Sequence, residues 1–360
     1  MGGPLRVGVL GGGFMAAVHS RAARSAGAVL AGIASSSPAK GERAAGELGF
    51  EVAYDDARAL IEDDSIDVVH VCTPNGTHAE LALAAIAAGK HVVCEKPLAA
   101  TTAEATALVD AASAAGVVAT VPFAYRFHPM VREARARVAA GETGRLVTVR
   151  GSYLQDWLLG ASDDNWRVDP AAGGRSRAFA DIGSHLVDLL EFVTGERIAA
   201  LASLTSTVHA ERGGRRVETE DAAGVIVRLE GGAVGTLLVS QVTAGHRNEL
   251  VLEVSGLEES LRFEQELPET LWVGRRDSAT LVPRDGSILR PDAARLSIVP
   301  SGHPMGYQDA FTAFARDTYA AVAGADVEGL PTFADGLRAA RITDAVLDAS
   351  AAGAWVDVPA

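Results

Sequence analysis

Short apolar runs alternate with alanine-rich segments of helical spacing over the first third of the chain. The runs cover 5–10, 28–34, 67–72, 91–94 and 117–121, with a weaker one at 51–54. Parallel strands need crossover connections, usually helices, and these crossovers are almost always right-handed. The sequence therefore predicts an α/β fold that begins with a parallel sheet of the Rossmann type, with one strand for each run.

Two predicted helices carry both start and stop signals. Segments 77–80 and 101–104 both read Thr-x-x-Glu, a capping-box pattern that satisfies free backbone amides at a helix start. Gly89 and Gly116 follow where these helices should end. The sequence thus places a helix directly before each of the last two strands.

The regular alternation of strand and helix patterns ends after Tyr125. The pattern predicts a helix over 129–140, a strand over 146–153, a long polar loop to 174, a helix from about 181, alternating strands at 223–229 and 233–240 with further strands to about 283, helices over 307–322 and 333–350, and a short strand at 355–358. A chain of 360 residues exceeds what one hydrophobic core usually serves. We therefore predict two domains: a Rossmann domain over 1–122 and, over 123–360, an α+β domain with a large, mostly antiparallel sheet.

Composition narrows the class of protein. The chain has 32 Lys and Arg against 46 Asp and Glu, a net charge of −14, which disfavours a nucleic-acid-binding surface. No apolar run approaches the roughly 18 residues of a membrane span, and the N-terminal sequence lacks a leader pattern, so a cytoplasmic protein is expected. Cys72 and Cys94 both lie in apolar runs, which suits buried thiols better than a metal site.

A glycine-rich segment follows the first predicted strand and opens a helix. Gly11 allows a tight turn, Gly13 lets a pyrophosphate approach the backbone, and Ala16 permits close helix–strand packing. A turn without a ligand is the alternative, which the strand–loop–helix context disfavours. The residues assigned here to the cofactor are Gly11, Gly12, Gly13, Phe14 and Met15.

The end of the second strand bears on the choice between NAD and NADP. A carboxylate there would bind the adenosine ribose of NAD, but the chain has Ser35, Ser36 and Ser37. These serines, with Lys40 or Arg43, could hold the 2′-phosphate of NADP. They could equally begin a turn and cap the next helix, so both cofactors stay open.

Two loops follow neighbouring strands at the edge of the sheet where ligands bind. Thr73-Pro74-Asn75, with His78 shortly after, follows the strand at 67–72, and Glu95-Lys96-Pro97 follows the strand at 91–94. We expect these residues to face the cofactor, with Lys96 toward the nicotinamide. An exposed ion pair is the alternative interpretation of Lys96.

With Asp181-Ile182-Gly183-Ser184-His185, these motifs resemble the glucose–fructose oxidoreductase / inositol dehydrogenase / rhizopine-catabolism (Gfo/Idh/MocA) oxidoreductase family over essentially the full length. Further matching pieces are His19, Tyr125-Arg126-Phe127 and Trp166-Arg167, of which Trp166 and Arg167 are assigned to the cofactor. The resemblance implies hydride transfer between NAD(P) and a hydroxyl-bearing carbon of a sugar or cyclitol. It also implies a lysine beside the nicotinamide, an often cis prolyl bond after it, and dimers or tetramers formed through the open sheet.

The resemblance assigns Lys96, Asp181 and His185 to catalysis, and their chemistry fits. The last two are spaced i, i+4, so on a helix they share one face. His185 suits removal of the hydroxyl proton, Lys96 would stabilise the developing alkoxide, and Asp181 would orient Lys96 or the substrate. The alternative for His185 is a structural histidine of the helix.

The long loop supplies a wall for the substrate. Tyr153, Gln155 and Trp157 combine aromatic faces with an amide, which suits the apolar C–H surfaces and hydroxyl rim of a carbohydrate. Asp181, His185 and Arg126 are also assigned to the substrate. Arg126 could instead bind the cofactor, and an interdomain ion pair is a comparable alternative. Trp157 and Trp166 could instead belong to the core.

The sequence is also compatible with two functions other than a dehydrogenase. One is a glycosidase-type enzyme in which bound NAD oxidises a sugar hydroxyl transiently, without net redox change. The other is a non-catalytic dinucleotide sensor, because a fold alone does not fix a function.

Overall fold

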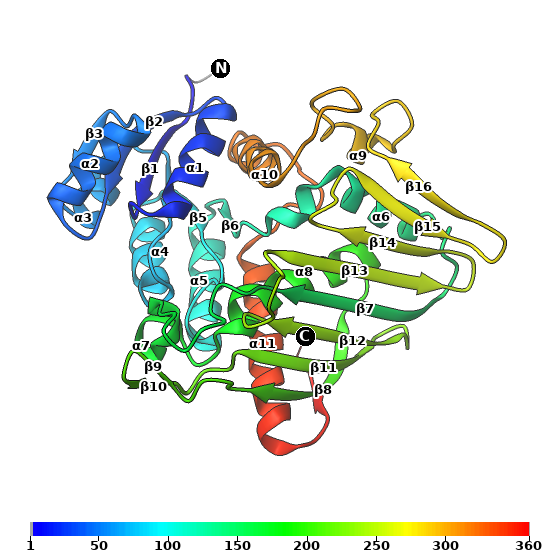
Figure 1. The fold of residues 1–360 in the computed structure, drawn as a ribbon. Coiled ribbons are helices and arrows are strands. Elements are labelled where there is room, and N and C mark those ends of the chain that lie inside the picture. Colours follow the sequence, from blue (N-terminus) through cyan, green and yellow to red (C-terminus); the bar gives the residue numbers. More distant parts are fainter. Residues whose placement is uncertain (1–2, 360) are drawn as a thin grey trace. The chain divides into compact units, whose positions relative to one another are not determined.

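The computed structural model describes residues 3–359, which form two compact units (Figure 1). Of the described residues, one unit contains 3–124 and 307–337, and the other contains 125–306 and 338–359. Within the described range, no helix is long and apolar enough to cross a membrane, and no group of His, Cys, Asp and Glu is placed to hold a metal ion.

The first unit contains the predicted parallel sheet. Its strands are β1 (Arg6–Leu10), β2 (Val29–Ala34), β3 (Val52–Tyr54), β4 (Val68–Val71), β5 (His91–Cys94) and β6 (Ala119–Thr120). They pair in the order β3-β2-β1-β4-β5-β6, and all pairs are parallel. The order reverses between β1 and β4, which is where doubly wound sheets bind ligands beyond the strand ends. All six predicted strands are confirmed.

The helices of this unit are α1 (Phe14–Ser25), α2 (Pro38–Leu48), α3 (Ala57–Glu62), α4 (His78–Ala87), α5 (Thr102–Ala115) and α10 (Tyr307–Val322). Although α10 follows the second sheet in sequence, it packs against α1, and Gln308 Nε2 donates to Val18 O at 3.2 Å. The Rossmann unit therefore contains a helix from the last sixth of the chain.

One predicted capping box is confirmed and the other is wrong. Thr101 and Glu104 cap α5 reciprocally, and Gly116 ends that helix in the left-handed conformation. Thr77 makes no such cap, because a 3-10 turn over Asn75–Thr77 already leads into α4. Its hydroxyl instead donates toward Thr73 Oγ1 at 2.7 Å.

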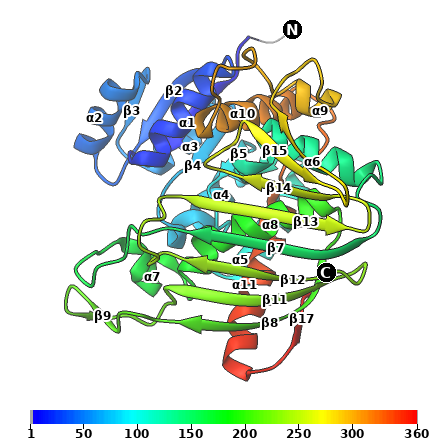
Figure 2. The same ribbon diagram turned by 45° about the vertical axis from the view of Figure 1, so that its right-hand side comes forward.

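The second unit is built on a nine-stranded sheet (Figure 2). Its strands, in spatial order, are β16 (Ala279–Pro283), β15 (Thr270–Gly274), β14 (Ser260–Glu264), β13 (Glu249–Gly256), β7 (Leu146–Leu154), β12 (Val234–Ser240), β11 (Ala222–Leu229), β8 (Ile198–Ser206) and β17 (Val356–Asp357). Only the β7–β12 pair is parallel, so the predicted mostly antiparallel sheet is confirmed. One face packs on α6 (Pro129–Ala139) and α8 (Ser184–Thr194). The last helix in sequence is α11 (Phe333–Ala352).

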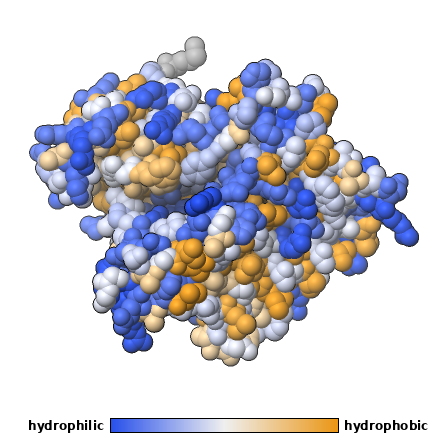
Figure 3. Space-filling model, in the orientation of Figure 1, coloured by the Kyte–Doolittle hydropathy of each residue, from blue (hydrophilic) through white to orange (hydrophobic). Residues whose placement is uncertain are grey.

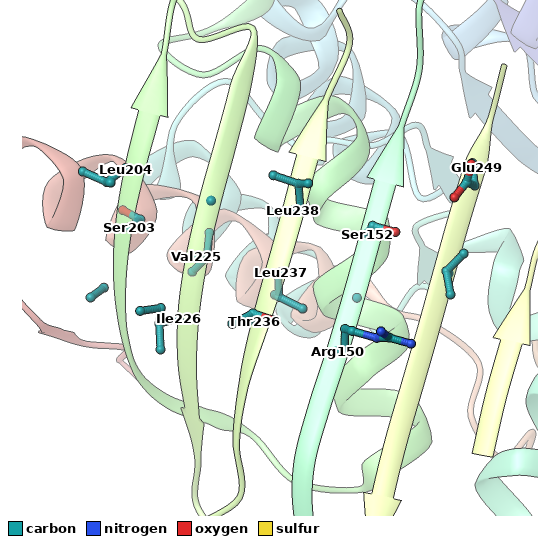
Figure 4. Close-up of a pocket in the computed structure, with 14 residues that line it drawn as sticks. Arg150, Ser152, Ser203, Leu204, Val225, Ile226, Thr236, Leu237, Leu238 and Glu249 are labelled. Carbon is teal, nitrogen blue, oxygen red and sulfur yellow. The ribbon is translucent and has the colours of Figure 1, made fainter. Parts of the chain in front are cut away.

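The opposite face of this sheet exposes apolar side chains over β8, β11 and β12 (Figure 3). Leu204, Ile226 and Leu238 are 75%, 51% and 49% exposed. Gly224 pairs with both Leu204 and Leu238, and no atom lies within 4 Å of where its Cβ would be. A hollow of about 730 Å³ lies over this face and extends from Leu204 across Gly224 to Arg150 and Glu249 (Figure 4).

Candidate active site

The glycine loop between β1 and α1 has the geometry that a pyrophosphate needs. Gly11 has φ +112°, and a Cβ there would lie 2.6 Å from Cys72 O, so only glycine fits. Gly13 is the N-cap of α1, and no atom lies within 4 Å of where its Cβ would be. No side chain caps the first amides of α1. The loop therefore leaves room and free amides for a dinucleotide phosphate.

The end of β2 carries hydroxyls and one nearby cation. Ser36 Oγ accepts from Lys40 Nζ at 3.1 Å, and Ser35 Oγ lies 3.0 Å from where a Cβ of Gly12 would be. Ser37 is the N-cap of α2, although its side chain makes no capping bond. The serine segment thus does begin a helix, while Ser35 lies beside Gly12 of the glycine loop and Lys40 contacts Ser36.

The two loops after β4 and β5 are tied together by His78. Its Nδ1 lies 2.8 Å from Pro97 O and its Nε2 lies 2.9 Å from Thr73 O. The ring is buried, which lowers the pKa of His78. The Lys96–Pro97 peptide bond is cis, as the family resemblance implies. His78 therefore lies between the two loops, and as a neutral ring it donates a hydrogen bond to one of these two carbonyl oxygens.

Glu95 points into the protein. Its carboxylate is within 2.9 Å of His19 Nε2 and accepts the backbone N–H of Lys96 at 3.1 Å. The side chain is buried. The structure therefore brings Glu95 together with His19 and the backbone of Lys96, a pairing that the sequence analysis missed.

Asp181 lies in a π-helical turn, Phe179–Gly183, that leads directly into α8. The helix predicted from about 181 therefore starts two residues earlier and with a wider turn; π turns of this kind are frequent at functional sites. Gln241 Nε2 donates to Asp181 Oδ2 at 2.8 Å, and Arg167 Nε lies 3.3 Å from Asp181 Oδ1. Two side chains thus orient this carboxylate.

His185, in the first turn of α8, lies against two tyrosines. Its ring centroid is 5.0 Å from that of Tyr125, with the rings edge to face, and 6.4 Å from that of Tyr153. Burial raises the pKa of Tyr125, so the phenol stays protonated. His185 is therefore held in a wall of hydroxyl-bearing rings.

Asn248 organises that wall. Its Nδ2 donates to Tyr125 OH at 3.2 Å, Tyr125 and Tyr153 share a 2.6 Å hydrogen bond, and Tyr153 OH donates to Asn248 Oδ1 at 2.7 Å. Gln155 Nε2 donates to the same oxygen at 2.8 Å, and Gln155 Oε1 accepts from Trp157 Nε1 at 2.7 Å. The predicted Tyr153, Gln155 and Trp157 are thus brought together around Asn248, a residue that the sequence analysis did not assign.

The remaining predicted residues have other neighbours. Arg126 is buried, and its Nε donates to Asp188 Oδ2 at 2.8 Å, so it forms an ion pair with a residue of its own unit. Arg167 stacks on Trp166 at 4.3 Å. Trp157 packs against a small core cluster, so it contributes to packing as well as to the hydrogen-bonded wall.

Comparison with known proteins places this architecture in a family. The model described as "Oxidoreductase family, NAD-binding Rossmann fold" matches residues 5–123, and the "GFO/IDH/MocA C-terminal domain" matches 131–262. Levoglucosan dehydrogenase of Pseudarthrobacter phenanthrenivorans is 34% identical over an alignment 390 positions long, which covers 99% of this chain and 98% of that protein.

Solved structures of the same family are similar to this chain over nearly its full length. Levoglucosan dehydrogenase in complex with NADH and levoglucosan is 34% identical, with a TM-score of 0.93 over 99% of this chain and 100% of that one. An inositol dehydrogenase homolog from Azotobacter vinelandii, in complex with NADH and myo-inositol, is 29% identical, with a TM-score of 0.89 over 99% and 98% of the two chains. The chain is therefore a member of the GFO/IDH/MocA oxidoreductase family, whose N-terminal domain is an NAD-binding Rossmann fold.

Proposed function

We propose that this protein is an NAD-dependent dehydrogenase that oxidises a secondary hydroxyl of a sugar-like substrate, with 1,6-anhydrosugars such as levoglucosan as the first candidate and cyclitols as the second. The observation that carries the proposal is the full-length similarity to levoglucosan dehydrogenase. The wall of Tyr153, Gln155, Trp157 and Asn248 supports a carbohydrate, because it combines aromatic faces with fixed amide groups.

Three side chains carry the chemistry in this proposal. When bound, the nicotinamide ring supplies the hydride acceptor. His185 removes the hydroxyl proton, Lys96 donates a hydrogen bond to the same oxygen as negative charge develops, and Asp181 orients the reacting groups. Gln241 and Arg167 fix Asp181, so that carboxylate is already oriented before substrate binds.

A panel of initial rates tests the substrate class. Reduction of NAD and of NADP is followed at 340 nm with levoglucosan, a second anhydrosugar, myo-inositol, scyllo-inositol, glucose and xylose. We expect NAD and an anhydrosugar to give the highest kcat/KM. A preference for an inositol would move the substrate to the second class, and activity with none of the six, despite measurable NADH binding, would contradict the proposal.

Substitution at Gly13 tests the cofactor site. The backbone there is extended (φ −94°, ψ −161°) and a Cβ has no neighbour within 4 Å, so Gly13→Val fits the protein but occupies the space left for the pyrophosphate. We expect the Kd for NADH to rise at least about tenfold, a loss of about 1.4 kcal/mol, with an unchanged Tm. Gly46→Ala, on α2 with an equally open Cβ, is the matched control; equal NADH affinity in both variants would contradict the assignment.

The exposed sheet face supports a further proposal, self-association. A symmetric dimer would cover Leu204, Ile226 and Leu238 and fill the hollow above Gly224 (Figure 4). We expect light scattering to give an oligomer for the wild type and the 37.2 kDa monomer for Leu238→Glu, because a buried charge is costly. Leu281→Glu, at a 62% exposed position on edge strand β16, should stay oligomeric. A wild-type monomer would contradict the proposal.

A further inference from the structure

We propose that Glu95 is a positioning residue for Lys96, held in place through His19 by a buried hydrogen-bond chain that starts at Tyr319. The inference rests on the proposed role of Lys96 and adds residues that act behind it. Tyr319 OH lies 3.0 Å from His70 Nε2, and His70 Nδ1 lies 2.9 Å from His19 Nδ1. His19 Nε2 lies 2.9 Å from Glu95 Oε1, and Glu95 Oε2 accepts the backbone N–H of Lys96 at 3.1 Å.

The four side chains come from four elements of one unit: α10, β4, α1 and the end of β5. All are buried, with exposures of 7% for Tyr319, 1% for His70, 1% for His19 and 5% for Glu95. His70 is the exception in an otherwise apolar strand, Val68–Val71. A buried polar group is costly unless it is hydrogen-bonded. Here each of the four side chains lies within hydrogen-bond distance of the next one along the series.

The number of hydrogens on these side chains fixes which atom donates in each hydrogen bond. A carboxylate only accepts, so with Glu95 ionised the hydrogen of His19 is on Nε2. A neutral His19 then accepts at Nδ1, so His70 donates from Nδ1 and its Nε2 accepts the hydrogen of Tyr319. Burial lowers the pKa of His70 and raises that of Tyr319, which favours the neutral ring and the protonated phenol that this arrangement needs.

The consequence concerns the backbone of Lys96. Glu95 fixes the N–H of Lys96, while His78 lies 2.8 Å from Pro97 O on the other side of the cis bond. Both anchors are buried in the Rossmann unit. Without the donor at His19, the Glu95 carboxylate loses a hydrogen bond that orients it, and the backbone N–H of Lys96 is held less precisely. Such misalignment lowers kcat and leaves cofactor affinity nearly unchanged.

The first test is spectroscopic and needs neither cofactor nor substrate. Long-range ¹H–¹⁵N spectra of the full-length, ¹⁵N-histidine-labelled protein at pH 8 report which ring nitrogen carries hydrogen, and the His19 and His70 signals are assigned by His19→Gln and His70→Asn. We expect hydrogen on Nε2 of His19 and on Nδ1 of His70. Any other pair of tautomers overturns the proposed chain, whether or not the enzyme accepts the expected sugar.

The second test is kinetic and uses whichever substrate the panel identifies. A glutamine amide at position 19 places an N–H near the position of Nε2, whereas an asparagine amide lies near Nδ1. His19→Asn should lower kcat by about tenfold to a hundredfold with KM for NAD within about threefold, and His19→Gln should recover most of that loss. Ser20→Ala, next to His19 and equally buried on α1, is the control for general loosening. Equal kcat for the two His19 variants, or an equal loss in Ser20→Ala, overturns the positioning role.

Discussion

Replacing Lys96 by methionine should lower kcat by about three orders of magnitude, because the variant loses both a hydrogen bond to the reacting oxygen and a possible partner in proton transfer. Methionine matches the aliphatic part of lysine out to Cε and lacks only the amine, and the contacts on either side are untouched: Glu95 binds the backbone N–H of residue 96, and His78 lies against Pro97 O. The loop should therefore keep its conformation, and the Kd for NADH should stay within about threefold of wild type.

Lys96→Arg sharpens this prediction. Arginine keeps the positive charge but does not release a proton near neutral pH. A loss of at least about a hundredfold in kcat would indicate that Lys96 shares the proton transfer, whereas a small loss would limit its role to charge stabilisation. Wild-type kcat in Lys96→Met would contradict the assignment of Lys96 altogether.

The second large effect is expected at His185. Without a general base the hydroxyl proton has no acceptor in the wall formed by Tyr125 and Tyr153, since burial raises the pKa of Tyr125 and holds it protonated. His185→Asn should therefore lower kcat by about 10²- to 10⁴-fold, with an unchanged Kd for NADH. His209→Asn, at a histidine of the same unit that contacts Leu159 O, is the matched control and should retain activity.

The prediction for His185 fails if His185→Asn and His209→Asn have the same kcat. It also fails if the Tm of His185→Asn falls far enough that the loss of kcat reflects unfolding, because His185 would then serve the packing of α8 against the tyrosines. Circular dichroism melting of both variants separates the two cases.

Local patterns were sufficient to predict most of the fold. The six parallel strands follow from short apolar runs separated by helices, and the cap at Thr101 follows from residues three positions apart. The failure at Thr77 has a local cause that spacing does not reveal, since the preceding residues already form a 3-10 turn. The same holds for Asp181, where the π turn widens a helix that periodicity predicts as regular.

The site was predictable where its residues share one loop and not where partners come from distant strands. Tyr153, Gln155 and Trp157 lie close together in sequence, but Asn248, which joins them, is about 90 positions away. Gln241 reaches Asp181 across 60 positions. No periodicity encodes such pairings. The inward direction of Glu95 was missed for the same reason, because His19 and His70 belong to other elements.

The motif Tyr125-Arg126-Phe127 does not by itself decide the role of Arg126. The sequence leaves substrate binding and an ion pair equally open, and the buried contact with Asp188 occupies its guanidinium within the second unit. The assignment of Arg126 to the substrate stays a prediction, and an Arg126→Lys variant would measure what this ion pair contributes to stability.

The rival functions differ from a dehydrogenase in what they do to the cofactor. A glycosidase-type enzyme regenerates its NAD in each turnover, and a sensor does not turn over. The relatives named as levoglucosan dehydrogenase favour net oxidation instead.

One measurement tests this central claim most directly: the stoichiometry of reduced cofactor to substrate in a single batch reaction. The purified full-length protein is incubated with excess NAD and a limiting amount of levoglucosan, NADH is read at 340 nm, and the sugar products are identified by mass spectrometry. The proposal predicts one NADH per sugar consumed and a product two mass units lighter than the substrate. Consumption of sugar with ring or glycosidic cleavage and a constant level of NADH would contradict it.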